Sequence, residues 1–147
     1  MNITIINGPN LNMLGVREPT LYGSGTLKDL ENYIMESSKR FNNVHLEFFQ
    51  TNHEGTIIDI IQNLVGVANG LIINAGAYTH TSIGILDAIK AVNIPTVEVH
   101  LTDVENREVF RHISYISLVA KKIISGKGFD GYVEGLEFLV ANFSEQQ

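Results

Sequence analysis

NGPNLNMLGVREPTLYG, residues 7–23, follows a short apolar run, Ile3–Ile6, that is typical of a buried β-strand. This stretch is far longer than the roughly two to six residues that usually connect a strand to a helix. Long loops in compact domains are usually functional or disordered, and this one contains too many apolar residues, Leu11 and Leu14 among them, to be disordered. We therefore interpret residues 8–25 as a partly packed active-site loop that ends in a mobile lid.

Composition and charge favour one soluble globular domain over residues 1–147. Hydrophobic residues make up 44% of the chain and charged residues 18%, which is ordinary for such a domain. The net charge of −6, without any run of basic residues, disfavours a nucleic-acid partner. Cysteine is absent, which excludes thiolate nucleophiles, disulfides and cysteine-ligated metals. No basic leader precedes the first strand and no apolar stretch reaches ~18 residues, so we expect a cytoplasmic protein that does not associate with membranes.

Apolar runs of strand type alternate with segments of helical periodicity along the chain. The expected strands are Ile3–Ile6, Val44–Phe49, Leu71–Ile73, Thr96–Val99 and one within Ser117–Ile124. The expected helices run from a Thr26 cap to about Arg40, from Glu54 to Asn69, over Ser82–Val92 and over Tyr132–Asn142, with a short helical turn in Asp103–Phe110. Such alternation predicts a doubly wound α/β fold, a five-stranded parallel sheet with helices on both faces in the flavodoxin-like order 2-1-3-4-5.

Polar side chains gather just after three of the predicted strands. In open α/β sheets, ligands bind outside the carboxyl ends of the strands, where the strand order reverses. The residues expected to converge on that crevice are Asn7, Asn10, Arg17, Tyr22, Asn74, His80, His100 and Arg111, and Thr102 and Asp103 follow the same strand as His100. This convergence is the main functional inference that the residues allow.

Most of these residues also have a purely structural interpretation. An asparagine after a strand, such as Asn7, often only builds a turn. His80 could bond free backbone groups beside a helix start, and His100 could be a hydrogen-bonded core histidine. Arg17 and Tyr22 could merely tie down the loop. These alternatives stay open at this point.

Several kinds of catalysis are disfavoured by missing motifs. No histidine pair has the close helical spacing of a zinc site, and neither a GxSxG elbow nor a Walker loop is present. Gly126, Gly128 and Gly131 spell GxGxxG, but no βαβ unit or later acidic residue follows, so close packing of the last helix explains them better. A receiver domain needs carboxylates after the first strand, where this chain has asparagine.

The chemistry that remains after these exclusions is metal-free acid–base catalysis on a small anionic substrate. A tyrosine normally ionises near pH ~10, and a nearby arginine lowers that value, so Arg17 could make Tyr22 a usable base. His100, on another element, could supply a proton. Asparagines would hold hydroxyl groups or an enolate oxygen, and Arg111 could bind a carboxylate.

The motifs of the whole chain resemble those of type II 3-dehydroquinate dehydratases. They comprise residues 7–23, QTNHEG (50–55), INAGAYTHTS (73–82), VEVHL (97–101) and REVFRHISYIS (107–117). The resemblance implies a flavodoxin-like fold, a dodecamer built from trimers and no cofactor. It also implies a hydro-lyase that converts 3-dehydroquinate to 3-dehydroshikimate in the shikimate pathway of chorismate and aromatic amino acid biosynthesis, or in quinate breakdown.

The resemblance also implies a role for individual residues. Tyr22 would remove the C2 proton, helped by Arg17, and Asn10 would hold the enolate by way of a water. His100 would protonate the departing C1 hydroxyl, with Glu98 orienting its ring. The implied substrate-binding residues are Asn74, His80, Leu101, Thr102 and Arg111, with Asp87 contributed by a neighbouring subunit. No metal ligand is implied.

Two departures from the family pattern bear on the site. Thr102-Asp103 stands where Ser-Asn is usual; threonine keeps the hydroxyl, whereas Asp103 would weaken binding of an anion if it faced the pocket. Leu118 replaces a common proline. The competing interpretations are a flavodoxin-like FMN or nucleotide carrier, which would need a hydroxyl- and glycine-rich phosphate loop, and a catalytically dead relative, which the presence of Tyr22, Arg17 and His100 together disfavours.

Overall fold

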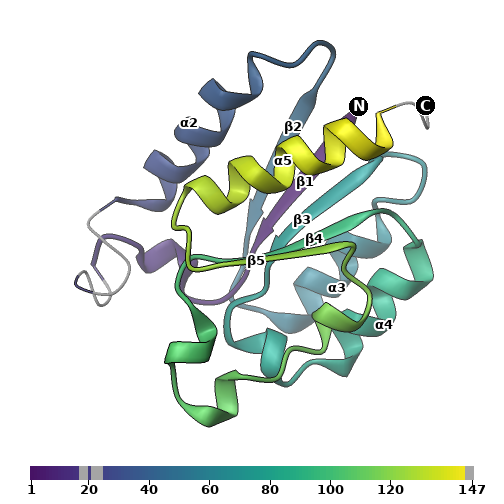
Figure 1. Cartoon of the computed structure of the whole chain (residues 1–147). Coiled ribbons are helices and arrows are strands. Elements are labelled where there is room, and N and C mark those ends of the chain that lie inside the picture. Colours follow the sequence, from purple (N-terminus) through teal and green to yellow (C-terminus); the bar gives the residue numbers. More distant parts are fainter. Residues whose placement is uncertain (17–19, 21–24, 145–147) are drawn as a thin grey trace.

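The computed structural model describes residues 1–16, 20 and 25–144, and these contain one parallel sheet of five strands (Figure 1). The strands are β1 (Asn2–Asn7), β2 (His45–Gln50), β3 (Gly70–Asn74), β4 (Thr96–His100) and β5 (Lys122–Ser125). Their order is β2-β1-β3-β4-β5, and every neighbouring pair is parallel. The predicted fold class and strand order are confirmed.

Helices cover both faces of the sheet. They are α2 (Leu27–Ser38), α3 (Glu54–Gln62), α4 (Ile83–Val92) and α5 (Asp130–Phe143). Figure 1 shows α2 and α5 on one face and α3 and α4 on the other. Among the described residues, no helix is long and apolar enough to span a bilayer.

The alternation of side chains along each strand divides the core into two layers. On β3, Ile72 packs beneath α2 and α5, whereas Leu71 and Ile73 pack beneath α3 and α4. On β1, Ile3 and Ile5 point to the α2 and α5 side and Ile6 to the other. Because both faces of β1 and β3 are buried, these strands are nearly continuous apolar runs, which explains why they could be recognised from the sequence.

The helix starts follow the capping residues. The Thr26 hydroxyl accepts from the Asp29 N–H while the Asp29 carboxylate accepts from the Thr26 N–H, a capping box that begins α2 as predicted. The Ser82 hydroxyl caps α4, accepting from the Ile85 N–H at 3.0 Å. The predicted starts of α2, α3 and α4 are confirmed to within one residue, whereas α5 begins at Asp130, two residues before the predicted Tyr132.

Two element boundaries differ from the prediction by more than two residues. We expected the second helix to reach Asn69, but α3 ends at Gln62 and a turn follows. We placed the fifth strand within Ser117–Ile124, whereas β5 begins at Lys122 and Ile116–Leu118 form the short 3-10 helix η5.

The glycines that follow β5 serve the turn and the packing of α5. Gly126 has φ +77°, a left-handed conformation that favours glycine. A Cβ at Gly131 would lie 3.2 Å from Ile124 Cγ2 and 3.4 Å from Val99 Cγ1, so that side of α5 lies directly on the sheet. These contacts agree with the expected packing role of the GxGxxG stretch.

Candidate active site

A pocket of about 190 Å³ opens at the carboxyl ends of β1, β3 and β4. Short 3-10 helices surround it: η1 (Leu11–Met13), η2 (Gly76–His80), η3 (Val104–Asn106) and η4 (Val109–Arg111). Its polar walls include seven side chains, those of Asn10, Asn74, His80, His100, Thr102, Arg107 and Arg111. Of these, only Arg107 was absent from the predicted set. The structure therefore brings together, at the ends of these strands, six of the polar residues predicted for the site.

The pair Glu98–His100 lies at the end of β4. Residues two apart on a strand point to the same side, and His100 Nε2 lies 2.8 Å from Glu98 Oε1. Glu98 is fully buried, whereas His100 lines the pocket and is 8% exposed. Because a carboxylate only accepts, the ring hydrogen on this side belongs to Nε2. The other ring nitrogen, Nδ1, is not bonded to Glu98.

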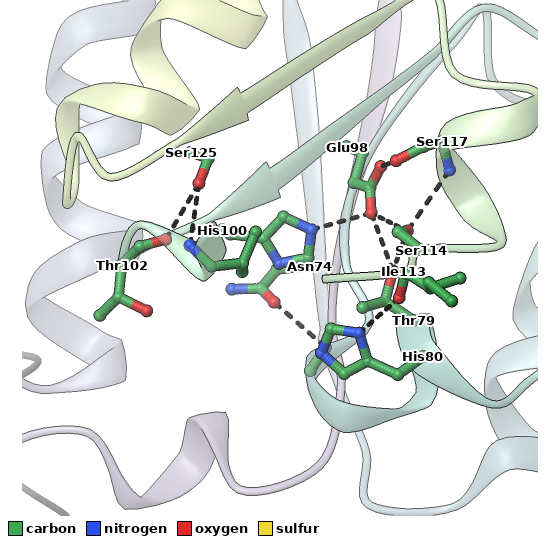
Figure 2. Close-up of polar contacts among 12 residues, drawn as sticks. Asn74, Thr79, His80, Glu98, His100, Thr102, Ile113, Ser114, Ser117 and Ser125 are labelled. Atoms are coloured by element: carbon green, nitrogen blue, oxygen red, sulfur yellow. Dashed lines mark hydrogen bonds and ion pairs between the residues drawn. The ribbon is translucent and has the colours of Figure 1, made fainter. Parts of the chain in front are cut away.

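Three hydroxyl groups surround the Glu98 carboxylate (Figure 2). Thr79 donates to Oε1 at 2.8 Å, Ser114 donates to the same oxygen and Ser117 donates to Oε2. Burial raises the pKa of Glu98, but the hydrogen bond and charge of His100 and the serine hydroxyls outweigh it and lower the pKa to about 2. Glu98 is therefore ionised at neutral pH despite its burial.

His80 is oriented by the segment before η5. Its Nδ1 lies 2.6 Å from the carbonyl oxygen of Ile113, and since a carbonyl only accepts, Nδ1 carries a hydrogen (Figure 2). In the neutral ring, Nε2 is then an acceptor. His80 thus bonds the backbone through one ring nitrogen, and the residue also lines the pocket.

Asn10 is held by residues that follow β2. It adopts a left-handed conformation, φ 70°, and its N–H donates to Asn52 Oδ1 at 3.0 Å. Gln50 Nε2 donates to the Gly8 carbonyl at 3.2 Å. Thus the QTNHEG stretch fixes the beginning of the active-site loop.

Asn7 was expected at the crevice, and it is not part of the pocket wall. It is fully buried, and its Oδ1 accepts a hydrogen bond from the Tyr132 hydroxyl at 2.6 Å. The first residue after an apolar run can still lie within the sheet, and β1 in fact ends at Asn7. Asn7 therefore neither lines the pocket nor builds a turn, and its side chain bonds within the core.

Two arginines form one wall of the pocket. Arg111 Nε donates to Glu108 Oε2 at 2.8 Å, and Arg107 Nη1 donates to Thr102 Oγ1 at 3.4 Å. Arg107 was missed because its role depends on tertiary contact with Thr102; its only signal in the sequence was its place in the same motif, one 3-10 turn before Arg111. Two guanidinium groups suit an anionic ligand.

The departures from the family pattern leave the pocket wall intact. Thr102 and Leu101 line the pocket. The side chain of Asp103 is exposed and caps η3, accepting from the Glu105 N–H at 3.0 Å and from Asn106 Nδ2 at 2.8 Å. Asp103 therefore adds no carboxylate to the pocket wall.

Besides Asn7, four predicted site residues are not placed in the wall of this pocket. Arg17 and Tyr22 lie outside the described residues. Glu98 is buried behind His100, and Asp87 is exposed on α4; neither lines the pocket. Within residues 1–16, 20 and 25–144, no three acidic or histidine side chains are grouped as metal ligands would be.

Comparisons with known proteins agree with the geometry. The family model for class II dehydroquinases matches residues 1–140. The chain is 49% identical to a 3-dehydroquinate dehydratase of Bartonella henselae, over 100% of this chain and 99% of that one. It is also 49% identical to a catabolic 3-dehydroquinase of Penicillium rubens, over 99% and 94% of the two chains. The crystal structure of a type II dehydroquinase from Butyrivibrio crossotus superimposes with a TM-score of 0.91 at 45% identity, over 95% and 97%.

Proposed function

The chain belongs to the class II dehydroquinases, hydro-lyases that dehydrate 3-dehydroquinate, and from that premise we propose an anti elimination through an enolate. The product would be 3-dehydroshikimate, in the shikimate pathway toward chorismate and aromatic amino acids. Neither a metal nor a cofactor takes part. The observation that carries the proposal is the ionised, buried Glu98 bonded to His100 at the pocket wall.

His100 acts as the general acid. The Glu98 carboxylate accepts from Nε2 and stabilises the protonated imidazolium, so Nδ1 can present a hydrogen to the C1 hydroxyl of the substrate. That hydroxyl leaves as water when it takes the proton and the C1–O bond breaks. The ring is then neutral, and a proton from solvent restores it.

Tyr22 acts as the general base on the opposite side of the substrate ring. Its phenolate, favoured by the charge of Arg17, takes the C2 proton, and the electron pair of the C–H bond moves into the enolate of the C3 carbonyl. Asn10 stabilises the enolate oxygen by way of a water. The enolate then expels the C1 oxygen, which leaves a conjugated double bond between C1 and C2. Both Arg17 and Tyr22 belong to the lid that we propose for residues 8–25.

The remaining pocket residues bind the substrate. Arg111 binds the carboxylate, supported by the charge of Arg107 on the same wall. The hydroxyls and the carboxylate of the substrate also bind to groups of four further residues, Asn74, His80, Leu101 and Thr102. Asp87 reaches the pocket of a neighbouring subunit in a dodecamer of trimers. We place this single-domain enzyme, residues 1–147, in the cytoplasm.

A continuous ultraviolet assay with 3-dehydroquinate tests the proposal, because the conjugated product absorbs and the substrate does not. We expect turnover by the purified protein, unchanged after treatment with borohydride in the presence of substrate. Loss of activity after borohydride would indicate a Schiff base to a lysine and refute the enolate route. A folded oligomer without turnover would refute the function.

A further inference from the structure

A fully buried tyrosine joins the last helix to the ends of two strands. Tyr132 lies in the first turn of α5 and is 0% exposed. Its hydroxyl donates to Asn7 Oδ1 at 2.6 Å and accepts from Asn74 Nδ2 at 3.0 Å. Asn7 and Asn74 are direct partners in the register of β1 and β3. The hydroxyl therefore bridges two asparagines at the carboxyl ends of adjacent strands.

These hydrogen bonds connect Asn7, Tyr132 and Asn74 in series, and the direction of each bond is fixed. Asn7 Oδ1 can only accept, so the Tyr132 hydrogen points to it, and the oxygen of Tyr132 is left to accept from Asn74. Burial raises the pKa of the Tyr132 hydroxyl, which keeps this hydrogen in place. The other polar atom of the Asn74 amide, Oδ1, accepts from the Gly76 N–H at 3.1 Å.

These two contacts hold the Asn74 amide in one orientation. If the amide were flipped, its NH2 would face the Gly76 N–H and its oxygen would face the acceptor side of Tyr132, and buried polar groups would lose their partners. In the observed orientation, Asn74 keeps one Nδ2 hydrogen and one Oδ1 lone pair that these two bonds do not use. Asn74 lines the pocket and is only 4% exposed, so those groups are available to a bound hydroxyl.

We propose that Tyr132 is a positioning residue for substrate binding: its hydroxyl fixes the Asn74 amide so that the amide recognises a hydroxyl group of the substrate. The inference rests on the proposed function, because Asn74 is placed there among the substrate-binding residues. Tyr132 itself does not line the pocket, and it acts through Asn74. Asn7 completes this series of hydrogen bonds, although its own Nδ2 has no hydrogen-bond partner among the described residues.

Tyr132→Phe is the primary test, since it removes one oxygen and keeps the ring that packs against the sheet. We expect KM for 3-dehydroquinate to rise about tenfold, the effect of one lost positioning hydrogen bond, with kcat within about twofold. Tyr33→Phe is the matched control, because the Tyr33 hydroxyl bonds to Asp130 on the surface, away from the pocket. Its kinetics should equal those of the wild type. An unchanged KM in Tyr132→Phe would overturn the proposal.

A double-mutant cycle separates positioning from a general loss of structure. In an Asn74→Ala background, Tyr132→Phe should have no further effect on KM, because the residue through which it acts is gone. Independent, multiplying effects would overturn the proposal. If Tyr132→Phe fails to fold, Asn7→Ala tests the same chain, since it removes the acceptor of the Tyr132 hydrogen; we expect KM to rise there too, and an unchanged KM would contradict us.

A crystal structure of the Tyr132→Phe variant distinguishes this inference from the proposed function. A wild-type protein without turnover would refute the function, whatever Tyr132 does. The amide of Asn74 can still be inspected in that case. A rotated or displaced Asn74 side chain would support the positioning role, and an unchanged one would overturn it.

Discussion

Glu98 shows how one residue can combine burial with full charge. A carboxylate without exposure is costly unless its oxygens are hydrogen-bonded, and here His100 and Thr79 reach Oε1 while Ser117 reaches Oε2. The acid–base chemistry that we propose for His100 depends on this charge. The charged residue thus does not line the pocket itself but bonds to His100, which does.

Removing the charge of Glu98 should therefore reduce turnover. Glu98→Gln keeps the shape of the side chain but no longer stabilises a protonated His100. We expect kcat to fall ~10²-fold, the lower end of what a positioned general acid contributes. The ultraviolet assay measures this, with circular dichroism to verify folding. A kcat equal to that of the wild type would show that His100 does not need the carboxylate.

The serine hydroxyls at Glu98 should stabilise the folded chain. Ser117→Ala removes a donor to a buried carboxylate, so we expect the free energy of unfolding to fall by about 1.5–3 kcal/mol. Ser37→Ala is the matched control, because that hydroxyl bonds to the Tyr33 carbonyl of its own helix, and it should shift the value by about 0.5 kcal/mol or less. Denaturant titration compares the two. Equal losses would indicate that the bond to Glu98 contributes nothing specific.

At the scale of elements, local sequence patterns predicted the strands of the sheet. They failed where contacts with residues distant in the sequence determine the structure of a segment. The apolar runs of β1 and β3 and the Thr26 cap could be read directly. Residues 116–118 are apolar enough for a strand, but the Tyr115 N–H bonds the Thr79 carbonyl at 2.9 Å and Ser117 bonds Glu98, which holds this segment as a 3-10 turn. No local pattern encodes those partners.

The same distinction explains what was found of the candidate site. His100 and Asn74 end strands, so the fold rule for parallel sheets placed them correctly. Arg107 and Tyr132 approach the site from other elements, through Thr102 and Asn74, and these contacts exist only in the folded chain. Their roles could not be derived from spacing.

The contact between the active-site loop and η2 offers a test at this scale. A Cβ at Gly8 would lie 2.5 Å from the Ala75 carbonyl oxygen, so Gly8→Ala must push the loop away from η2. We expect a loss of about 1–3 kcal/mol in unfolding free energy, and a lower kcat/KM because Asn10 is displaced. Gly55→Ala, where a Cβ has no neighbour within 4 Å in the described part of the chain, is the control and should be neutral or slightly stabilising. Similar behaviour of both variants would contradict the predicted clash.

At the scale of the whole molecule, the proposed acid and the stability of the fold share one carboxylate. Glu98 lies in a strand inside the sheet, and its partners come from β4, η2 and the segment of residues 114–117. Protonation of Glu98 would therefore weaken contacts among three parts of the chain at once. Its effect should appear in global unfolding as well as in catalysis.

The pH dependence of unfolding tests this coupling. The pKa of Glu98 is lowered from 4.5 to about 2, so the unfolded chain binds the proton more readily than the folded one. The stabilisation is complete above pH ~4.5 and is lost as pH falls toward ~2; at ~1.4 kcal/mol per pH unit it amounts to about 3 kcal/mol. Urea titrations of wild type and Glu98→Gln should therefore show a stability difference that shrinks over this window, because other carboxylates contribute equally to both. A difference that stays constant from pH 5 to pH 2 would mean that Glu98 titrates alike in the folded and unfolded chains, and the coupling between its charge and the stability of the fold would be refuted.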